Sequence, residues 1–113
     1  MKINISLLIL VWLSSYLHAS DIVTIDTKRA KSIYDAHTAL WIDTRTASSY
    51  KHGTIMGALS MPIKRYNRMK RFLPRSLHAR VIIFGDYASK ISKKLSALGY
   101  DNILLYVDGY DKW

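Results

Sequence analysis

The sequence contains no cysteine and no glutamate, so its eight acidic side chains are all aspartates. The missing cysteines exclude disulfide bonds, a disulfide-linked partner, thiolate-bound metals and cysteine nucleophiles. Only two prolines occur, and no repeat or long linker interrupts the 113 residues, so we expect one small domain. Half of the residues are apolar, which is enough for a packed core.

Long apolar runs are also missing, apart from one near the N-terminus. That run, Ile5 to Leu13, follows a single lysine and precedes small and polar residues up to Ser20. It is shorter than the roughly 20 residues of an ordinary membrane-spanning helix. This layout is typical of a bacterial export signal, so we interpret residues 1–20 as a signal peptide and 21–113 as the mature domain. The protein is then periplasmic or secreted; an uncleaved N-terminal membrane anchor is the alternative.

Short apolar runs alternate with helical patterns along the rest of the chain. Strands are predicted at Asp21 to Ile25, Ala39 to Asp43, Ala58 to Met61, Arg80 to Phe84 and Asn102 to Val107. Helices are predicted from Thr27, as the capping residue, to Ala36, from Thr46 to Tyr50, from Lys64 to Leu73 and from Ala88 to Leu98. This alternation predicts an α/β fold, a small parallel sheet flanked by helices on both faces.

Two stretches carry motifs around the central strand. In Leu40 to Pro62, the motif residues are Asp43, Arg45, Tyr50, Gly53, Ile55, Gly57, Ala58 and Pro62; in Leu95 to Trp113 they are Gly99, Tyr100, Asn102, Ile103, Gly109 and Trp113. In type and order these residues resemble the signatures of rhodanese-like domains. The family usually has glutamate, histidine and glycine where this chain has Ser49, Thr54 and Asp108. The resemblance spans Ile22 to Trp113 and implies a rhodanese-like fold.

The motif residues also have structural roles that follow from their chemistry. Asp43 and Arg45 end a strand, where an ion pair can fix the following loop. Gly53 and Gly57 suit tight turns with positive φ. Trp113 is expected to close the core. We therefore assign a structural role to the set Asp43, Arg45, Gly53, Gly57, Gly109 and Trp113.

The resemblance also implies where chemistry would take place. Active members of the family have a cysteine directly after the central strand, and it carries sulfur as a persulfide inside a loop of inward-pointing N–H groups. Here Gly85 stands in the place of the cysteine, the loop is about three residues short, and Asp86 adds a negative charge. We therefore predict a degenerate loop without a catalytic residue, formed by Gly85, Asp86, Tyr87, Ala88 and Ser89. Asp86 is expected to favour or cap the helix that follows.

Ser89 is the candidate that could replace the nucleophile, but a serine needs an adjacent base. His37, His52 and His78 lie between the predicted elements, and no spacing relates them to Ser89. Their spacing does not suit metal ligation either, so we expect no metal and no cofactor.

The formal net charge is +9, and residues 64–80 contain seven basic residues and no acid. The predicted helix in this segment has Tyr66, Met69, Phe72 and Leu73 on one side. The candidates for binding an anionic surface are Lys64, Arg65, Arg68, Lys70, Arg71 and Arg75. An export signal argues against nucleic acid, which leaves an anionic membrane or an acidic partner. A solvated helix with its apolar stripe in the core is the alternative.

Together these features predict an exported rhodanese-like domain without sulfurtransferase chemistry. We expect it to act as a binding or scaffolding module of the cell envelope, with an envelope protein or an anionic membrane surface as its partner. Two alternatives stay open. One is a divergent sulfurtransferase that handles sulfane sulfur with a partner thiol, and the other is a basic module that binds membrane surfaces.

Overall fold

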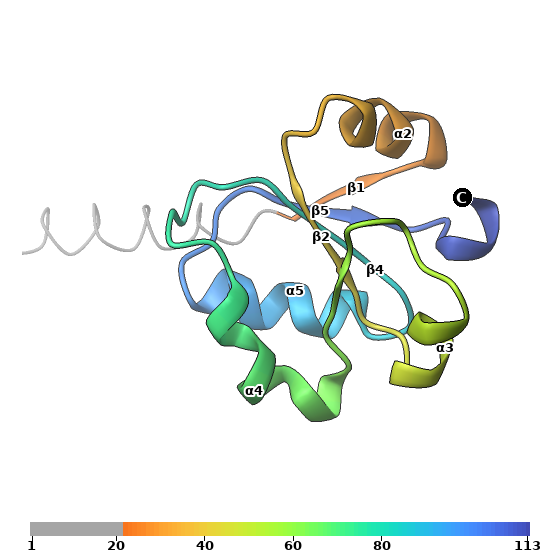
Figure 1. Ribbon diagram of the computed structural model, residues 1–113. Helices are drawn as coiled ribbons and strands as arrows, with labels where there is room; N and C mark the ends of the chain where they lie inside the picture. The colour runs from red at the N-terminus through yellow and green to blue at the C-terminus, as the bar shows by residue number, and fades with distance from the viewer. Residues whose placement is uncertain (1–21) are drawn as a thin grey trace, which may run out of the picture.

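The computed structural model describes residues 22–113, and the predicted signal peptide at residues 1–20 lies outside them. Five parallel strands form a sheet in the order β1-β5-β4-β2-β3 (Figure 1). The strands are β1 (Val23–Ile25), β2 (Leu40–Asp43), β3 (Leu59–Ser60), β4 (Val81–Phe84) and β5 (Ile103–Tyr106). The parallel α/β fold predicted from the sequence is confirmed.

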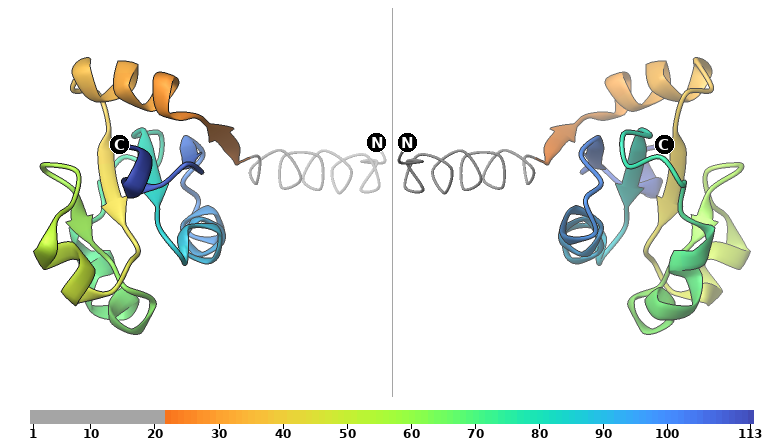
Figure 2. Two further views of the ribbon diagram at one scale, coloured as in Figure 1. Left: turned by 90° about the vertical axis from the view of Figure 1, so that its right-hand side faces the viewer. Right: turned by 90° about the vertical axis from the view of Figure 1, so that its left-hand side faces the viewer.

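Helices cover both faces of this sheet. They are α2 (Thr27–Asp35), α3 (Ala47–His52), α4 (Tyr66–Met69) and α5 (Ala88–Ala97), together with the 3-10 turns η1 (Ile63–Arg65), η2 (Lys70–Phe72) and η3 (Tyr110–Lys112). Figure 2 shows α2 on one side of the sheet and α4 and α5 on the other. Within the described residues, none of the helices has the length and apolar character needed to cross a bilayer.

The core consists of two apolar clusters, one on each face of the sheet. All four residues of β4 are buried, as its continuous apolar run predicts for a central strand. Because side chains alternate along a strand, Val81 and Ile83 pack with α5, whereas Ile82 and Phe84 pack with α2. The helices α2 and α5 therefore pack on opposite faces of β4. This packing fixes the position of the loop after β4.

The predicted helix from Lys64 to Leu73 is wrong as a continuous element. The segment divides into η1, α4 and η2, and Leu73 has extended backbone angles. Pro74 explains this end, since a proline disfavours helical angles in the residue before it. Tyr66 is buried as expected, but Phe72 leaves the apolar side with the tighter 3-10 turn and is exposed.

The N-terminal cap of α2 is Asp26 and not Thr27. The Asp26 carboxylate accepts a hydrogen bond from the backbone N–H of Arg29 at 2.9 Å. Thr27 becomes the first helical residue, and its hydroxyl donates instead to Asp108 at 2.7 Å. For α3 the predicted cap is present, since Thr46 accepts from the N–H of Ser49 at 3.1 Å.

Candidate functional site

The candidate site lies where β2 and β4, neighbours in the sheet, reach their carboxyl ends. Asp43 is the last residue of β2, and Gly85 follows directly after β4. The backbone N–H of Thr44 donates to the carbonyl of Phe84 at 2.9 Å, which holds the two strand ends together. In open parallel sheets, this edge is where ligands bind.

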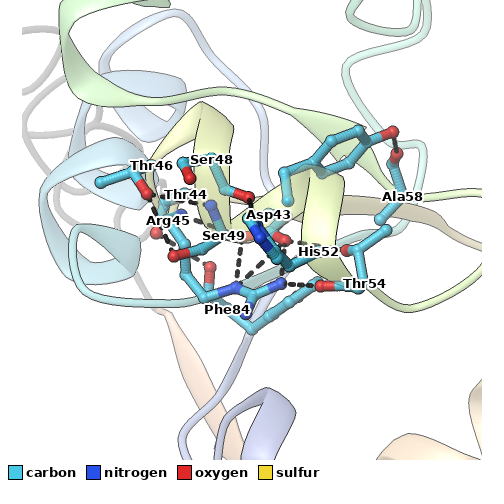
Figure 3. A network of polar contacts seen from close by, with 12 residues as sticks. Asp43, Thr44, Arg45, Thr46, Ser48, Ser49, His52, Thr54, Ala58 and Phe84 are labelled. Atoms are coloured by element: carbon cyan, nitrogen blue, oxygen red, sulfur yellow. Dashed lines mark hydrogen bonds and ion pairs between the residues drawn. The ribbon is translucent and has the colours of Figure 1, made fainter.

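Asp43 is fully buried at the centre of a polar network (Figure 3). Its carboxylate pairs with Arg45, with 2.8 Å between Oδ2 and Nη2, and accepts the backbone N–H of Arg45 at 2.9 Å. Thr54, which replaces the family's usual histidine, donates its hydroxyl to the same carboxylate at 2.8 Å. With both oxygens engaged in this way, the Asp43 carboxylate holds Arg45 and Thr54 in fixed positions.

The guanidinium of Arg45 is committed to the same network. Its Nη2 also donates to the carbonyl of Gly53 at 2.6 Å, and its Cζ lies 4.5 Å from the ring centroid of Tyr110. The hydrogen bond to Asp43 raises the pKa of Arg45 above its ordinary value, and burial acts in the opposite direction. The positive charge of Arg45 is thus compensated by the buried carboxylate of Asp43.

The two glycines expected in turns with positive φ behave differently. Gly57 has a φ of 89°, as predicted. Gly53 has a φ of 162°, which is extended backbone, so the prediction for Gly53 is wrong. The reason for a glycine there is space, because a Cβ on Gly53 would lie 2.6 Å from the hydroxyl oxygen of Tyr110.

Gly85 sits in a turn with no room for a side chain. Its φ is 105°, and an added Cβ would lie 2.8 Å from Thr44 Oγ1 and 3.0 Å from the backbone nitrogen of Arg45. Sequence reasoning missed Thr44, although it lies inside the Asp-x-Arg motif. The buried hydroxyl of Thr44 donates to the carbonyl of Phe84 at 2.8 Å and accepts the N–H of Tyr87 at 3.1 Å. Thr44 therefore occupies the space in which a side chain at position 85 would project.

The short loop also uses its backbone donors internally. The N–H of Tyr87 bonds to Thr44, and the N–H of Ala88 donates to the carbonyl of Gly85 at 3.1 Å. Tyr87 is the residue preceding α5, and no side chain caps this helix, so the predicted capping role of Asp86 is wrong. Asp86 lies in the turn between Gly85 and the start of α5 at Ala88, and its side chain is exposed.

Ser89 is exposed in the first turn of α5, and no histidine is bonded to it in the described part of the chain. His52 bonds through Nδ1 to the carbonyl of Ser48 at 2.8 Å, and His78 bonds through Nδ1 to Asp101 at 2.6 Å. Residues 22–113 contain no group of three histidine or carboxylate side chains that could hold a metal ion.

Two hollows flank the loop after β4. One, of about 430 Å³, lies between the loop and residues 105–111, and three carboxylates line it together with Arg45: Asp86, Asp108 and Asp111. The other, of about 360 Å³, is lined on the opposite side by Thr44, Thr46, Ala47, Tyr87 and residues 62–65. The first hollow is acidic, so it disfavours an anion next to Gly85.

The segment after β5 joins this edge to α2. Asp108, where the family usually has glycine, accepts hydrogen bonds from the hydroxyl and the N–H of Thr27, and these bonds lower the pKa of Asp108. Gly109 follows with a φ of 80°. Trp113 packs with ring centroids 5.2 Å from Tyr34 and 5.4 Å from Trp41, so it closes the core as expected.

The basic candidates lie mostly away from this edge. Lys64, Arg65, Arg68, Lys70, Arg71 and Arg75 are all exposed. Only Lys64 and Arg65 contribute to the second hollow. The structure therefore separates most of the positive charge from the loop after β4.

Comparisons with known proteins agree with this geometry. The family profile described as "Rhodanese-like domain" matches residues 18–113. No curated protein sequence gives a significant match.

Several solved structures share the fold. A human single-domain sulfurtransferase, TSTD1, is 21% identical with a TM-score of 0.64, over 80% of this chain and 93% of that one. The Alr3790 protein from Anabaena is 24% identical with a TM-score of 0.66, over 79% and 73%. An uncharacterized protein from Saccharomyces cerevisiae is 19% identical with a TM-score of 0.67, over 83% and 92%.

At these identities the structural likeness shows a common fold, and the family match extends over the whole described sheet. The residues of the two rhodanese-like motifs form the polar network of Asp43 and Arg45 and the turns at Gly57 and Gly109. The chain belongs to the rhodanese-like domain family.

Proposed function

We propose that this rhodanese-like chain is a non-catalytic binding domain of the cell envelope, and that it does not transfer sulfur. The observation that carries the proposal is the packing around Gly85. The place where an active relative has its cysteine lacks a side chain, and Thr44 and Arg45 fill the space that one would need.

The chemistry of sulfur transfer needs three features that this site does not offer. A thiolate must carry the sulfur, and the sequence contains no cysteine. Backbone N–H groups must converge on the sulfur, whereas those of Tyr87 and Ala88 bond within the protein. A positive field must favour the anion, whereas Asp86 and two further carboxylates line the adjoining hollow.

The alternative is a divergent sulfurtransferase that uses a thiol from a partner protein. The less acidic hollow beside Thr44 and Lys64 is where such a thiol could approach. In this case the chain would hold the sulfur compound while the partner attacked it. A non-catalytic binding domain stays inactive when a thiol is added, whereas the divergent sulfurtransferase gains sulfur-transfer activity.

A thiosulfate-to-cyanide transfer assay, with and without an added small thiol, tests the proposal. We expect the parent chain to remain at the rate of a heat-denatured sample in both conditions. Parent activity above that rate, in either condition, would overturn the non-catalytic function, and thiol-dependent activity would establish the alternative.

The variant Gly85→Cys asks whether the nucleophile alone is missing. We expect it to remain inactive, since its side chain would meet Thr44 and Asp86 would raise the pKa of the new thiol above about 8.5. Ser89→Cys is the matched control, because it places one thiol on the exposed first turn of α5 in the same chain. Turnover by Gly85→Cys above that of Ser89→Cys would show that the loop is competent. Circular dichroism establishes that both variants are folded.

A further inference from the structure

The edge of the sheet opposite the candidate site has a surface of its own. All five strands are parallel, so β1, β4 and β5 begin at this amino edge, and the described chain enters there at Ile22. The segments before β4 and β5 are joined at this edge. The N–H of Asp101 donates to the carbonyl of Leu77 at 3.1 Å, and the hydroxyl of Tyr100 donates to the carbonyl of Pro74.

Apolar side chains are exposed on these joined segments. Phe72 is 53% exposed, Leu77 is 42% exposed and Leu98 is 49% exposed. Leu77 lies against the residue that follows Leu98, since a Cβ on Gly99 would lie 3.1 Å from Leu77 Cδ1. Single exposed apolar residues are ordinary, but a group of them on one surface indicates an interaction site.

Exposed basic side chains lie on the two elements next to these segments. Lys64, Arg65, Arg68, Lys70, Arg71 and Arg75 come from the segment around α4, and Lys90, Lys93 and Lys94 come from α5, all of them exposed. The two sources adjoin, because Lys94 Nζ lies 5.1 Å from the ring centroid of Tyr66 in α4. The nearby acid at the amino edge, Asp101, is bonded to His78 at 2.6 Å. We call this surface, with Phe72, Leu77 and Leu98, the α4–α5 face.

We propose that the α4–α5 face docks on an anionic lipid bilayer, with Phe72, Leu77 and Leu98 entering the headgroup region. Peripheral membrane binding combines buried apolar area with attraction between basic side chains and anionic lipids. Exposed leucines beside arginines and lysines match that combination. Nucleic acid offers phosphates and stacking bases, and neither gives the leucines a partner.

In the alternative in which residues 1–20 are kept as an anchor, the N-terminal chain gives the same orientation. The apolar run Ile5 to Leu13 is connected to the domain at Ile22, which lies at the amino edge. A chain that approaches from a membrane would therefore reach the domain on the side that carries Leu77 and Leu98. In this orientation the hollow between the loop after β4 and residues 105–111 stays open to a partner, whereas the hollow that Lys64 and Arg65 share with Thr44 borders the lipid-facing side. The inference names the surface partner of the proposed binding domain but rests on a different face, so lipid binding and sulfur transfer are tested independently.

Flotation of the full chain with phosphatidylglycerol–phosphatidylcholine vesicles tests the charged part of the face. We expect the triple variant Arg65→Gln, Arg68→Gln, Arg71→Gln to bind at least tenfold more weakly, because each basic residue near an anionic surface contributes about a fivefold gain. The control variant Lys28→Gln, Arg29→Gln, Lys51→Gln removes equal charge from α2 and α3 and should bind within about twofold of the parent. Pure phosphatidylcholine vesicles report any binding by the N-terminal run that all of these chains share.

A second pair of variants tests the apolar part. We expect Phe72→Ser with Leu77→Ser to weaken vesicle binding about fivefold or more, whereas Met56→Ser with Val107→Ser, which are also exposed but elsewhere, should not. Equal binding by the parent and the triple arginine variant would overturn the proposal. A second pair of results would also overturn it. In that case the arginine variant loses binding to a DNA oligonucleotide as well as to vesicles, and the variant Phe72→Ser with Leu77→Ser binds vesicles like the parent. That result would identify a general polyanion surface.

Discussion

Gly57 and Gly85 share a left-handed backbone but have different surroundings. Their φ angles are 89° and 105°. An added Cβ on Gly57 meets no atom within 4 Å, whereas one on Gly85 lies 2.8 Å from Thr44 Oγ1. The left-handed backbone disfavours a side chain at both positions, by roughly 1–2 kcal/mol. The contact adds a second cost at Gly85 only.

We therefore expect Gly57→Ala to lower the free energy of unfolding by about 1 kcal/mol and Gly85→Ala by about 2–4 kcal/mol. Urea denaturation of both variants beside the parent measures the difference. Gly57→Ala is the control, since it has the unfavourable φ without the contact. Equal losses would mean that Thr44 moves aside without cost, and the site would then have room for a side chain.

Two residues that differ from the pattern of the rhodanese-like motifs have polar partners in this chain. Thr54, in place of histidine, donates to Asp43 at 2.8 Å. Asp108, in place of glycine, accepts two bonds from Thr27. The sequence shows that these positions differ from the family, but their partners come from other elements and depend on the fold.

At the scale of elements, one carboxylate in the segment after β5 is bonded to the start of α2. The bonds from Thr27 to Asp108, at 2.7 and 2.9 Å, lower the pKa of Asp108 below the ordinary value of about 3.9. The unfolded chain therefore takes up a proton at this residue before the folded chain does as the pH falls. The stabilisation is complete above the ordinary pKa and is lost as the pH falls through the lowered one.

We predict that Asp108→Asn removes this part of the pH dependence. Below about pH 5, the free energy of unfolding should fall less steeply for Asp108→Asn than for the parent. The amide oxygen can still accept a bond from Thr27, so the connection to α2 is kept. Asp111→Asn, which removes the same charge from η3, is the matched control for the change in net charge. Identical slopes for the parent and Asp108→Asn would contradict the assignment.

The elements that could be predicted from sequence are those set by local chemistry. Thr46 caps α3 because its partner, Ser49, lies three residues away. The local pattern favours Thr27 as the cap of α2, although the adjacent Asp26 is equally suited to capping. Asp26 caps the helix while Thr27 is held by Asp108, which lies 81 residues away. No local pattern contains that contact.

At the scale of the whole molecule, the site and the α4–α5 face are products of topology. The absence of a thiol and the glycine after β4 are visible in the sequence. The sequence does not show that Thr44 fills the space next to Gly85, because Thr44 bonds to Phe84 and Tyr87, which are 40 or more residues away in the chain. In the same way, the lysines of α5 join the basic segment around α4 only once both elements pack on the same face of the sheet.

The connection between the N-terminal residues and the domain gives the last prediction. The layout of residues 1–20 predicts export and cleavage, so protein purified from the native host should begin near Ser20 or Asp21. Intact mass and N-terminal sequencing measure this, and protein translated without membranes, which keeps residues 1–20, is the control. An intact N-terminus on native protein in the membrane fraction would contradict cleavage and favour the anchor. The anchor would still enter at Ile22, on the amino edge, so the α4–α5 face would then be held against the lipid by the chain itself. If the N-terminus is kept, the arginine triple variant should stay in the membrane fraction; if it is cleaved, high salt should release the parent from the membrane.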